Sequence, residues 1–263
     1  MGRGLITYIS TYGYKCINAG NGIPLEVGAA GRSAFLYTIR DDTGDNISED
    51  NEYYGDLTAL YWIWKNGHLD SHDYVAFRHY NKHLYIKEHD AVEYLKSTGN
   101  GWIVAKACAN PPHNFVKEWE TFREIIKNKY PIYYPELLAL YDQADGSGNK
   151  CNAANMFITS AEQMNRYCEV LFKICRDLRE RIGDTEHTRY DQRYCAFMAE
   201  RFLTVYINTH SFPRLEVEVC RNRWVIQKMI MLAKALGFRN NNPVTRRIAA
   251  HLRKGIYKSS YIE

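Results

Sequence analysis

Polar side chains that suit a phosphate group stand at the end of the run "DYVAFRHYN", residues 73–81. The run alternates apolar and polar residues, which predicts a strand, and it ends in Arg78, His79 and Asn81. Arg forms bidentate contacts with phosphate oxygens, and His donates to phosphate or binds a metal such as Mn²⁺ or Mg²⁺. A lone His beside a strand is more often simply hydrogen-bonded. The sequence therefore predicts a diphosphate site, with His79 also a candidate metal ligand.

A second polar group is the turn "DDTGDNIS" at residues 41–48. It holds three carboxylates, a Gly, an Asn and a Ser within eight residues, close to the start of the next helix. This composition suits a polar ligand. Asp, Asn, Gly and Ser are also the residues that tight turns select, so both interpretations stay open.

An amphipathic helix is predicted at residues 53–66, directly after that turn. Leu57, Leu60 and Trp64 recur at the helical period and predict its buried face. The packing of this face does not explain the polar residues Asp56 and Thr58.

Another predicted helix, at residues 190–206, places charged residues among apolar ones. Arg193, Phe197 and Glu200 are spaced i, i+4 and i+7, so they share one face of the helix. One interpretation is an ion-pair ladder on the surface. The other is a partly buried Arg and Glu that are paired for positioning in a site.

These residues depend on a predicted α/β framework. Strands and helices alternate along the chain, which predicts a mixed, mainly parallel central sheet flanked by helices. Ligands of such sheets bind outside the carboxyl ends of the strands. The predicted strands are 4–11, 34–42, 73–80, 101–106 and 153–160, and the predicted helices are 53–66, 89–97, 160–182 and 190–210, with Ser160 as a helix cap.

Length and composition exclude several classes of protein. The 263 residues, 46% hydrophobic, are enough for a large core, and the seven scattered cysteines contain no C-x-x-C pair, which argues against a disulfide framework or a zinc knuckle. The N-terminus does not look like a signal peptide, and no apolar run reaches 18 residues. We expect a cytoplasmic protein without a transmembrane helix that is not secreted.

The charge distribution predicts two parts, a domain at 1–218 and a basic helical tail at 219–263. The tail has ten Lys and Arg against one acidic residue, whereas the rest has 24 against 29. A basic amphipathic helix can bind an anionic membrane surface, making the protein peripherally membrane-associated, or contact nucleic acid. It can also pack on its own domain with a solvated basic face. Nucleic acid is the least favoured of the three partners.

Six motifs along residues 23–207 resemble a known family. In order, the motifs are "IPLEVGAAG", "DDTGDNISEDN", "GDLTALYWIWKN", "DYVAFRHYNKHL", "NMFI" with "YCEVLF", and "RYCAFMAERFLTVYI". They resemble a domain of unknown function found in bacterial capsular and exopolysaccharide glycosyltransferases, with relatives in large DNA viruses of algae.

The resemblance implies a single nucleotide-binding domain of GT-A type that transfers a sugar from a nucleotide sugar, expected to be a UDP-sugar, to a glycan acceptor. A metal-binding D-x-D motif is usual in such enzymes, but this chain has "RHYN" at that place. Where the family tends to show His-Tyr-Arg-Arg, this chain has His79, Tyr80, Asn81 and Lys82.

The resemblance also suggests roles for particular residues. An inverting mechanism, which is the expected one, needs a carboxylate that deprotonates the acceptor; Asp191 is the first candidate and Glu200 the second, while a retaining mechanism stays open. The expected donor contacts are Gly28, Asp42, Asn46 and Asn51 for the nucleotide, Asp56 and Thr58 for the sugar or ribose, Arg78, His79 and Arg193 for the diphosphate, and Asn155 beside the sugar.

The competing function is non-catalytic binding of carbohydrate or nucleic acid. Its support is the basic tail together with five Trp, 21 Tyr and ten Phe, because aromatic faces stack on sugars and on bases.

Overall fold

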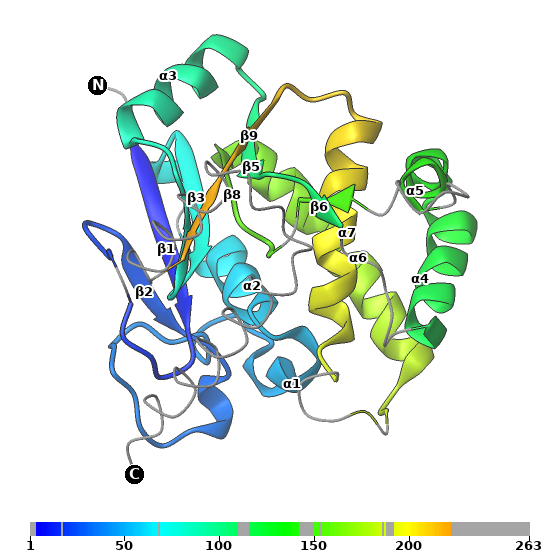
Figure 1. Ribbon diagram of the computed structural model, residues 1–263. Helices are drawn as coiled ribbons and strands as arrows, with labels where there is room; N and C mark the ends of the chain where they lie inside the picture. The colour runs from blue at the N-terminus through cyan, green and yellow to red at the C-terminus, as the bar shows by residue number, and fades with distance from the viewer. Residues whose placement is uncertain are drawn as a thin grey trace, which may run out of the picture. The chain divides into compact units, whose positions relative to one another are not determined.

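A mixed six-stranded sheet forms the centre of the fold in the computed structural model (Figure 1). The structure describes residues 4–16, 18–67, 69–109, 116–141, 150–152, 154–185, 187 and 192–221. The strand order is β2-β1-β3-β8-β5-β9. The strands are β1 (Leu5–Thr11), β2 (Ile23–Glu26), β3 (Tyr74–His79), β5 (Trp102–Ala105), β8 (Phe157–Ser160) and β9 (Arg214–Val217).

Five of these strands run in one direction, and β8 runs in the other. β1 pairs in parallel with β2 and β3, and β5 pairs in parallel with β9, whereas β8 is antiparallel to both of its neighbours. The start of β8 therefore lies at the edge where the other five strands end. The prediction of a mixed, mainly parallel sheet flanked by helices is confirmed.

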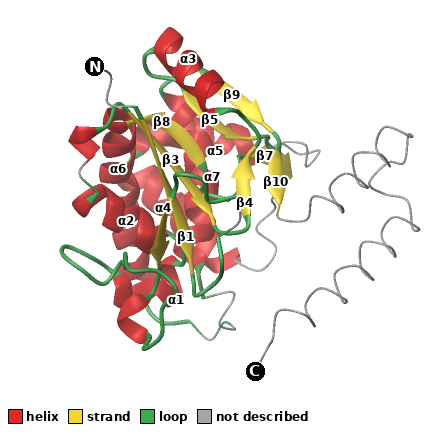
Figure 2. Ribbon diagram, turned by 90° about the vertical axis from the view of Figure 1, so that its left-hand side faces the viewer, coloured by secondary structure: helices red, strands yellow, loops and turns green. Residues whose placement is uncertain are grey.

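Helices cover both faces of the sheet (Figure 2). The larger core lies between the sheet and α2, α6 and α7, while α3 covers a smaller core on the other face. The helices are α1 (Asn51–Tyr54), α2 (Leu57–Asn66), α3 (Glu88–Thr98), α4 (Val116–Lys129), α5 (Tyr134–Tyr141), α6 (Ala161–Ile182) and α7 (Tyr194–Thr209), and the short strands are β4 (Lys82–Leu84), β6 (Cys108–Ala109), β7 (Lys150–Cys151) and β10 (Val219–Arg221). None of the described helices is long and apolar enough to cross a membrane.

The start of α6 agrees with its sequence signal. Ser160 has extended backbone, and its hydroxyl accepts a hydrogen bond from the backbone N–H of Gln163 at 3.2 Å. This bond satisfies one of the first N–H groups of the helix, which have no partner within it.

The predicted strand at 34–42 is wrong, and the strand next to β1 is instead β2. Only Arg40 of that segment makes a strand-like bridge, to Glu26. The buried carboxylate of Glu26 accepts hydrogen bonds from the backbone N–H groups of Leu36 and Tyr37, at 2.8 and 3.3 Å. These bonds keep the segment 34–42 as a surface loop. Its backbone N–H groups bond to a side chain and therefore need no partner in the sheet.

The loop after β2 is held by a second buried carboxylate, that of Asp41. It accepts hydrogen bonds from the backbone N–H groups of Gly28 and Ala29, at 2.9 and 3.0 Å, and from the Ser48 hydroxyl at 2.5 Å. Gly28 has a left-handed backbone, with φ +58°, and an added Cβ would lie 2.7 Å from the Asn51 side chain. Asp41 therefore fixes the turn that brings Gly28 against Asn51.

The chain divides into two compact units, residues 1–219 and 220–263. The second unit lies outside the described residues except for residues 220 and 221, and so does the predicted basic helical tail.

We predict that Asp41→Ala lowers the free energy of unfolding by about 3 kcal/mol, because it leaves buried donors without their charged acceptor. Asp42→Ala is the matched control. Asp42 is partly exposed, with Oδ1 3.2 Å from Arg40 Nε, and its loss should cost less than about 1 kcal/mol. Urea denaturation of both variants measures the difference. Equal losses would contradict this role of Asp41.

Candidate functional site

The candidate site lies where β3 ends beside the start of β8. Its side chains come from the residue before α2, from the end of β3 and from the first turns of α7. The antiparallel direction of β8 brings residues 154 and 155 to this edge, next to His79.

His79 is the residue around which the site is arranged. Its Nε2 lies 2.5 Å from the carbonyl oxygen of Ala154 and 3.6 Å from Oδ2 of Asp56. A carbonyl oxygen only accepts, so Nε2 has the proton. Burial lowers the pKa of His79 more than the Asp56 carboxylate raises it. The imidazole is therefore neutral at pH 7 and donates to Ala154.

The described residues do not fit a divalent metal at His79. Its Nε2 donates to a carbonyl group, so Nδ1 is the ring nitrogen that keeps a lone pair for a metal. No group of three or more His, Cys, Asp or Glu side chains with metal-binding geometry occurs within the described ranges.

The turn before β8 has an unusual backbone. Ala154 and Asn155 have φ of +79° and +47°, in the left-handed region that residues with a Cβ rarely adopt. The carbonyl group of Ala154 accepts from His79, and its N–H donates to the Glu200 carboxylate. Asn155 donates from Nδ2 to the carbonyl group of Ala196 at 3.2 Å. The turn thus joins β3 to α7.

Glu200 lies beside a second carboxylate. Burial raises its pKa, and so does the negative charge of Asp56, while Arg201, Lys82 and the Ala154 N–H act in the opposite direction. The net shift is upward. Glu200 therefore holds a proton to a higher pH than an exposed glutamate does.

Arg193 lies at the beginning of α7, and its positive charge reaches His79. Its guanidinium carbon is 6.0 Å from the Phe197 ring centroid. The backbone of Gly55, with φ +55°, lies close to the Arg193 side chain. A Cβ added at Gly55 would lie 3.1 Å from Arg193 Cδ. The structure therefore brings four predicted residues together, namely Asp56, His79, Arg193 and Glu200, with Asn155 next to them.

Gly28, Asn51 and Thr58 form a neighbouring group that supports the backbone. Asn51 Nδ2 donates to the carbonyl group of Gly55 at 2.7 Å and to the Thr58 hydroxyl at 3.1 Å. The Thr58 hydroxyl donates to the same carbonyl group at 3.1 Å, and Thr58 is fully buried. This group shapes the turn before α2, and Thr58 does not face the site.

Asp42 and Asn46 belong to a turn that contacts the far half of α2. Trp62 Nε1 donates to Thr43 at 2.9 Å, and Asn66 Nδ2 donates to the carbonyl group of Asp45 at 2.8 Å. Asn66 is ten residues beyond Asp56, about 15 Å along a helix. Asn46 bonds only within its own turn among the contacts described, from Nδ2 to Gly44 and from Ser48 to Oδ1. The structure does not bring this turn to His79.

Arg78 lies on the other face of the sheet from His79, because successive side chains of a strand point to opposite faces. Its Nη2 donates to the carbonyl group of Asn18 at 2.7 Å, and Nη1 to that of His79 at 3.3 Å. The structure thus separates Arg78 from the group it was predicted to join. Asp191, the first candidate base, lies outside the described residues.

Sequence reasoning missed three contributors. Ala154 acts through its backbone, which leaves no signal in a residue type. Lys82 is a charged residue three positions after His79, and its charge affects both His79 and Glu200. Gly55 inside the predicted helix at 53–66 was a signal that could have been used, because glycine is unfavourable within a helix and readily adopts a positive φ.

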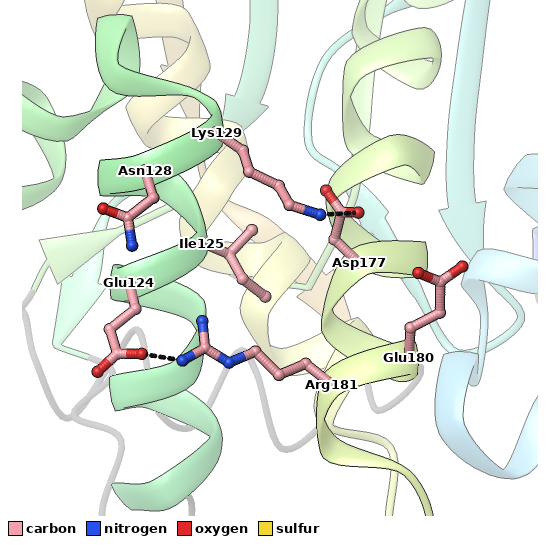
Figure 3. Close-up of a pocket in the computed structure, with 7 residues that line it drawn as sticks. All are labelled: Glu124, Ile125, Asn128, Lys129, Asp177, Glu180 and Arg181. Carbon is pink, nitrogen blue, oxygen red and sulfur yellow. Dashed lines mark hydrogen bonds and ion pairs between the residues drawn. The ribbon is translucent and has the colours of Figure 1, made fainter.

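A separate hollow lies between α4 and α6 (Figure 3). Lys129 and Asp177 point toward each other across it, 2.7 Å apart, and Arg181 pairs with Glu124. None of the predicted site residues lines this hollow. We interpret it as a surface depression between two helices that are linked by ion pairs.

Comparison with known proteins agrees with the fold. A family described as a domain of unknown function (DUF4422) matches residues 8–107 and 109–211. The solved apo structure of WbbM, a bifunctional glycosyltransferase, superimposes with a TM-score of 0.70 at 25% sequence identity over 83% of this chain. The match covers 45% of the WbbM chain, so this chain spans less than half of that protein. No curated protein matches the sequence.

The raised pKa of Glu200 predicts a pH-dependent stability. A carboxyl group with a raised pKa in the folded state stabilises the fold below its unfolded pKa, and this contribution is lost as the pH rises through the folded pKa. Relative to the wild type, Glu200→Gln should therefore gain stability between pH 4 and pH 7. Urea denaturation across this range measures the gain, with exposed Glu49→Gln as the control. A pH-independent difference would contradict the assignment.

Proposed function

The chain belongs to the DUF4422 family and has a glycosyltransferase fold, and from these premises we propose that it transfers a sugar from a nucleotide-sugar donor to a glycan acceptor. The proposed donor is a UDP-sugar, and the proposed setting is polysaccharide biosynthesis. The transferred sugar is a hexose or a pentose.

Two buried oxygen atoms next to His79 are the observation on which this proposal mainly rests. Asp56 Oδ2 and Asn155 Oδ1 are inaccessible to solvent, and neither accepts a hydrogen bond from the described residues. Buried acceptors nearly always have a donor. Sugar hydroxyl groups are donors of the kind that these two atoms lack.

Fixed cations would serve the donor diphosphate. Arg193 and Lys82 place two positive charges near His79, and charge that develops on a leaving nucleotide is stabilised by donors held in place before reaction. We assign these two residues to the diphosphate in place of Arg78. Because the described residues do not fit a metal, no step is assigned to one.

Glu200 is the base that the described residues support for an inverting reaction. A base is most effective when its pKa lies near the working pH, and burial together with Asp56 raises the pKa of Glu200 toward that range. Its contact with the Ala154 N–H would hold the carboxylate in one orientation. Asp191, three residues before α7, stays the second proposal for this role.

An aromatic pair that includes the residue after His79 suits a glycan acceptor. Tyr80 follows His79, and its ring stacks on that of Tyr14 with centroids 4.8 Å apart and planes at 16°. Tyr14 is 47% exposed. Aromatic faces of this kind pack against the apolar faces of sugars.

The decisive experiment compares three variants. Arg193→Ala should weaken UDP binding about tenfold or more, since one charge-assisted contact is worth 1.5–3 kcal/mol. Glu200→Gln should lower kcat about 100-fold or more while UDP binding stays within about threefold, as expected when a general base is lost. Glu49→Ala, in the exposed turn, should change neither quantity. Calorimetry measures binding, and release of UDP from a panel of UDP-sugars measures turnover.

If the wild type neither binds UDP nor hydrolyses any UDP-sugar, with or without Mn²⁺, the proposed function is wrong. If Glu200→Gln keeps full turnover, the base is another residue.

We also propose that residues 219–263 attach the protein to anionic membranes. The support is the excess of ten Lys and Arg over one acidic residue. Each basic residue near such a surface contributes about 1 kcal/mol.

Replacing Arg246, Arg247 and Arg253 by Glu in the full chain should weaken binding to phosphatidylserine vesicles by about 100-fold or more. Replacing Lys15, Lys87 and Lys96 of the first unit by Glu is the control and should have a smaller effect. Vesicle sedimentation measures both, and equal effects would contradict attachment through the tail.

A further inference from the structure

A cavity of about 290 Å³ lies on the face of the sheet that Arg78 occupies. Strands β1 and β3 form its floor, through Thr7 and Ala76 among others, and residues 18–22 and the beginning of α3 form its walls. His79, Asp56, Arg193 and Glu200 do not line it. The sheet therefore separates this cavity from the candidate site.

Arg78 is held at one end of the cavity. It is only 7% exposed, and its hydrogen bonds to the carbonyl groups of Asn18 and His79 fix the plane of the guanidinium group. A buried and oriented guanidinium group recognises planar or tetrahedral oxyanions better than a flexible ammonium group does.

His83 of β4 lines the same cavity and lies close enough to Arg78 for the two to interact electrostatically. Burial lowers its pKa, and the positive charge of Arg78 lowers it further, so His83 is neutral at pH 7 and can donate one N–H. Glu88 is the one carboxylate among the lining residues described, and it is an exposed residue in the first turn of α3. Arg78 is thus the one cation among the lining residues described, with His83 as a neutral donor near it.

The remaining lining combines aliphatic residues with the polar residues Thr7, Asn18 and Asn21. Leu84, Ile86, Ala91 and Ile158 provide aliphatic surface next to the two donors. The volume lies just below the range of about 300–1,000 Å³ that is usual for small-molecule sites. Such a site combines an apolar body with a few polar groups that fix the orientation of the ligand.

We propose that this cavity binds a small ligand in which a carboxylate or phosphate group is joined to an apolar body. The anionic group contacts Arg78 and His83, and the apolar body lies against the aliphatic residues. This binding is independent of sugar transfer and goes beyond it.

Calorimetry with phenyl phosphate and benzoate tests the proposal on the full chain. At least one probe should bind, and it should bind more tightly than inorganic phosphate, which lacks the apolar body. His83→Leu should weaken binding about tenfold, since it removes one hydrogen bond to a charged group. His89→Leu is the matched control. His89 is an exposed α3 residue outside the cavity, and its replacement should leave binding unchanged.

Two further variants separate the possible outcomes. Arg78→Lys, which keeps the charge but not the fork of donors, should also weaken binding, with folding checked by circular dichroism. Arg193→Ala should leave binding unchanged, and UDP should not displace the probe. The proposal is overturned if neither probe binds, if His83→Leu binds as well as the wild type, or if UDP displaces the probe. Loss of UDP binding alone would refute the donor site and leave this cavity unaffected.

Discussion

The hydrogen bond from His79 Nε2 to the carbonyl group of Ala154, 2.5 Å long, is the contact on which the arrangement of the site depends. It exists because β8 runs against its neighbours, which places the start of β8 next to the end of β3. It fixes the imidazole tautomer, and with it the direction in which His79 approaches Asp56. Ala154 also holds the Glu200 carboxylate, through its backbone N–H. One residue, Ala154, thus positions an imidazole and a carboxylate from two distant elements.

The left-handed backbone of Ala154 and Asn155 is a consequence of that arrangement. Residues with a Cβ reach this region at a cost of about 1–3 kcal/mol each, and they stay there only where surrounding contacts require it. Here the contacts are the bonds to His79 and Glu200 and the Asn155 bond to Ala196. A turn of this kind is pre-formed before any ligand arrives, which suits a site that must hold donors and acceptors in fixed directions.

The sequence alone predicted four strands of the sheet, β1, β3, β5 and β8, and the helices α3, α6 and α7, because their periodicity is strong. It missed β2 and β9, and it joined α1 and α2 into one helix across Gly55 and Asp56. It predicted Arg78 and His79 as one group, although a strand's period of two already separates adjacent side chains. The strand at 34–42 failed because Glu26, ten residues away in the chain, binds its backbone. Ala154 had no signal at all, since a backbone group acts alike in any residue type.

The acidic residues at this end of the sheet differ in the hydrogen bonds that their carboxylates accept. This difference distinguishes the residues that stabilise the fold from the residue that we expect to bind a ligand. Glu26 and Asp41 are fully buried, and each accepts several hydrogen bonds from loop donors. Asp56 Oδ2 is equally inaccessible but accepts no hydrogen bond from the described residues, and the His79 imidazole 3.6 Å from it is neutral. A buried charge with few donors is costly. A ligand that brings hydroxyl groups would remove that cost, so Asp56 contributes to binding where Glu26 and Asp41 contribute to folding.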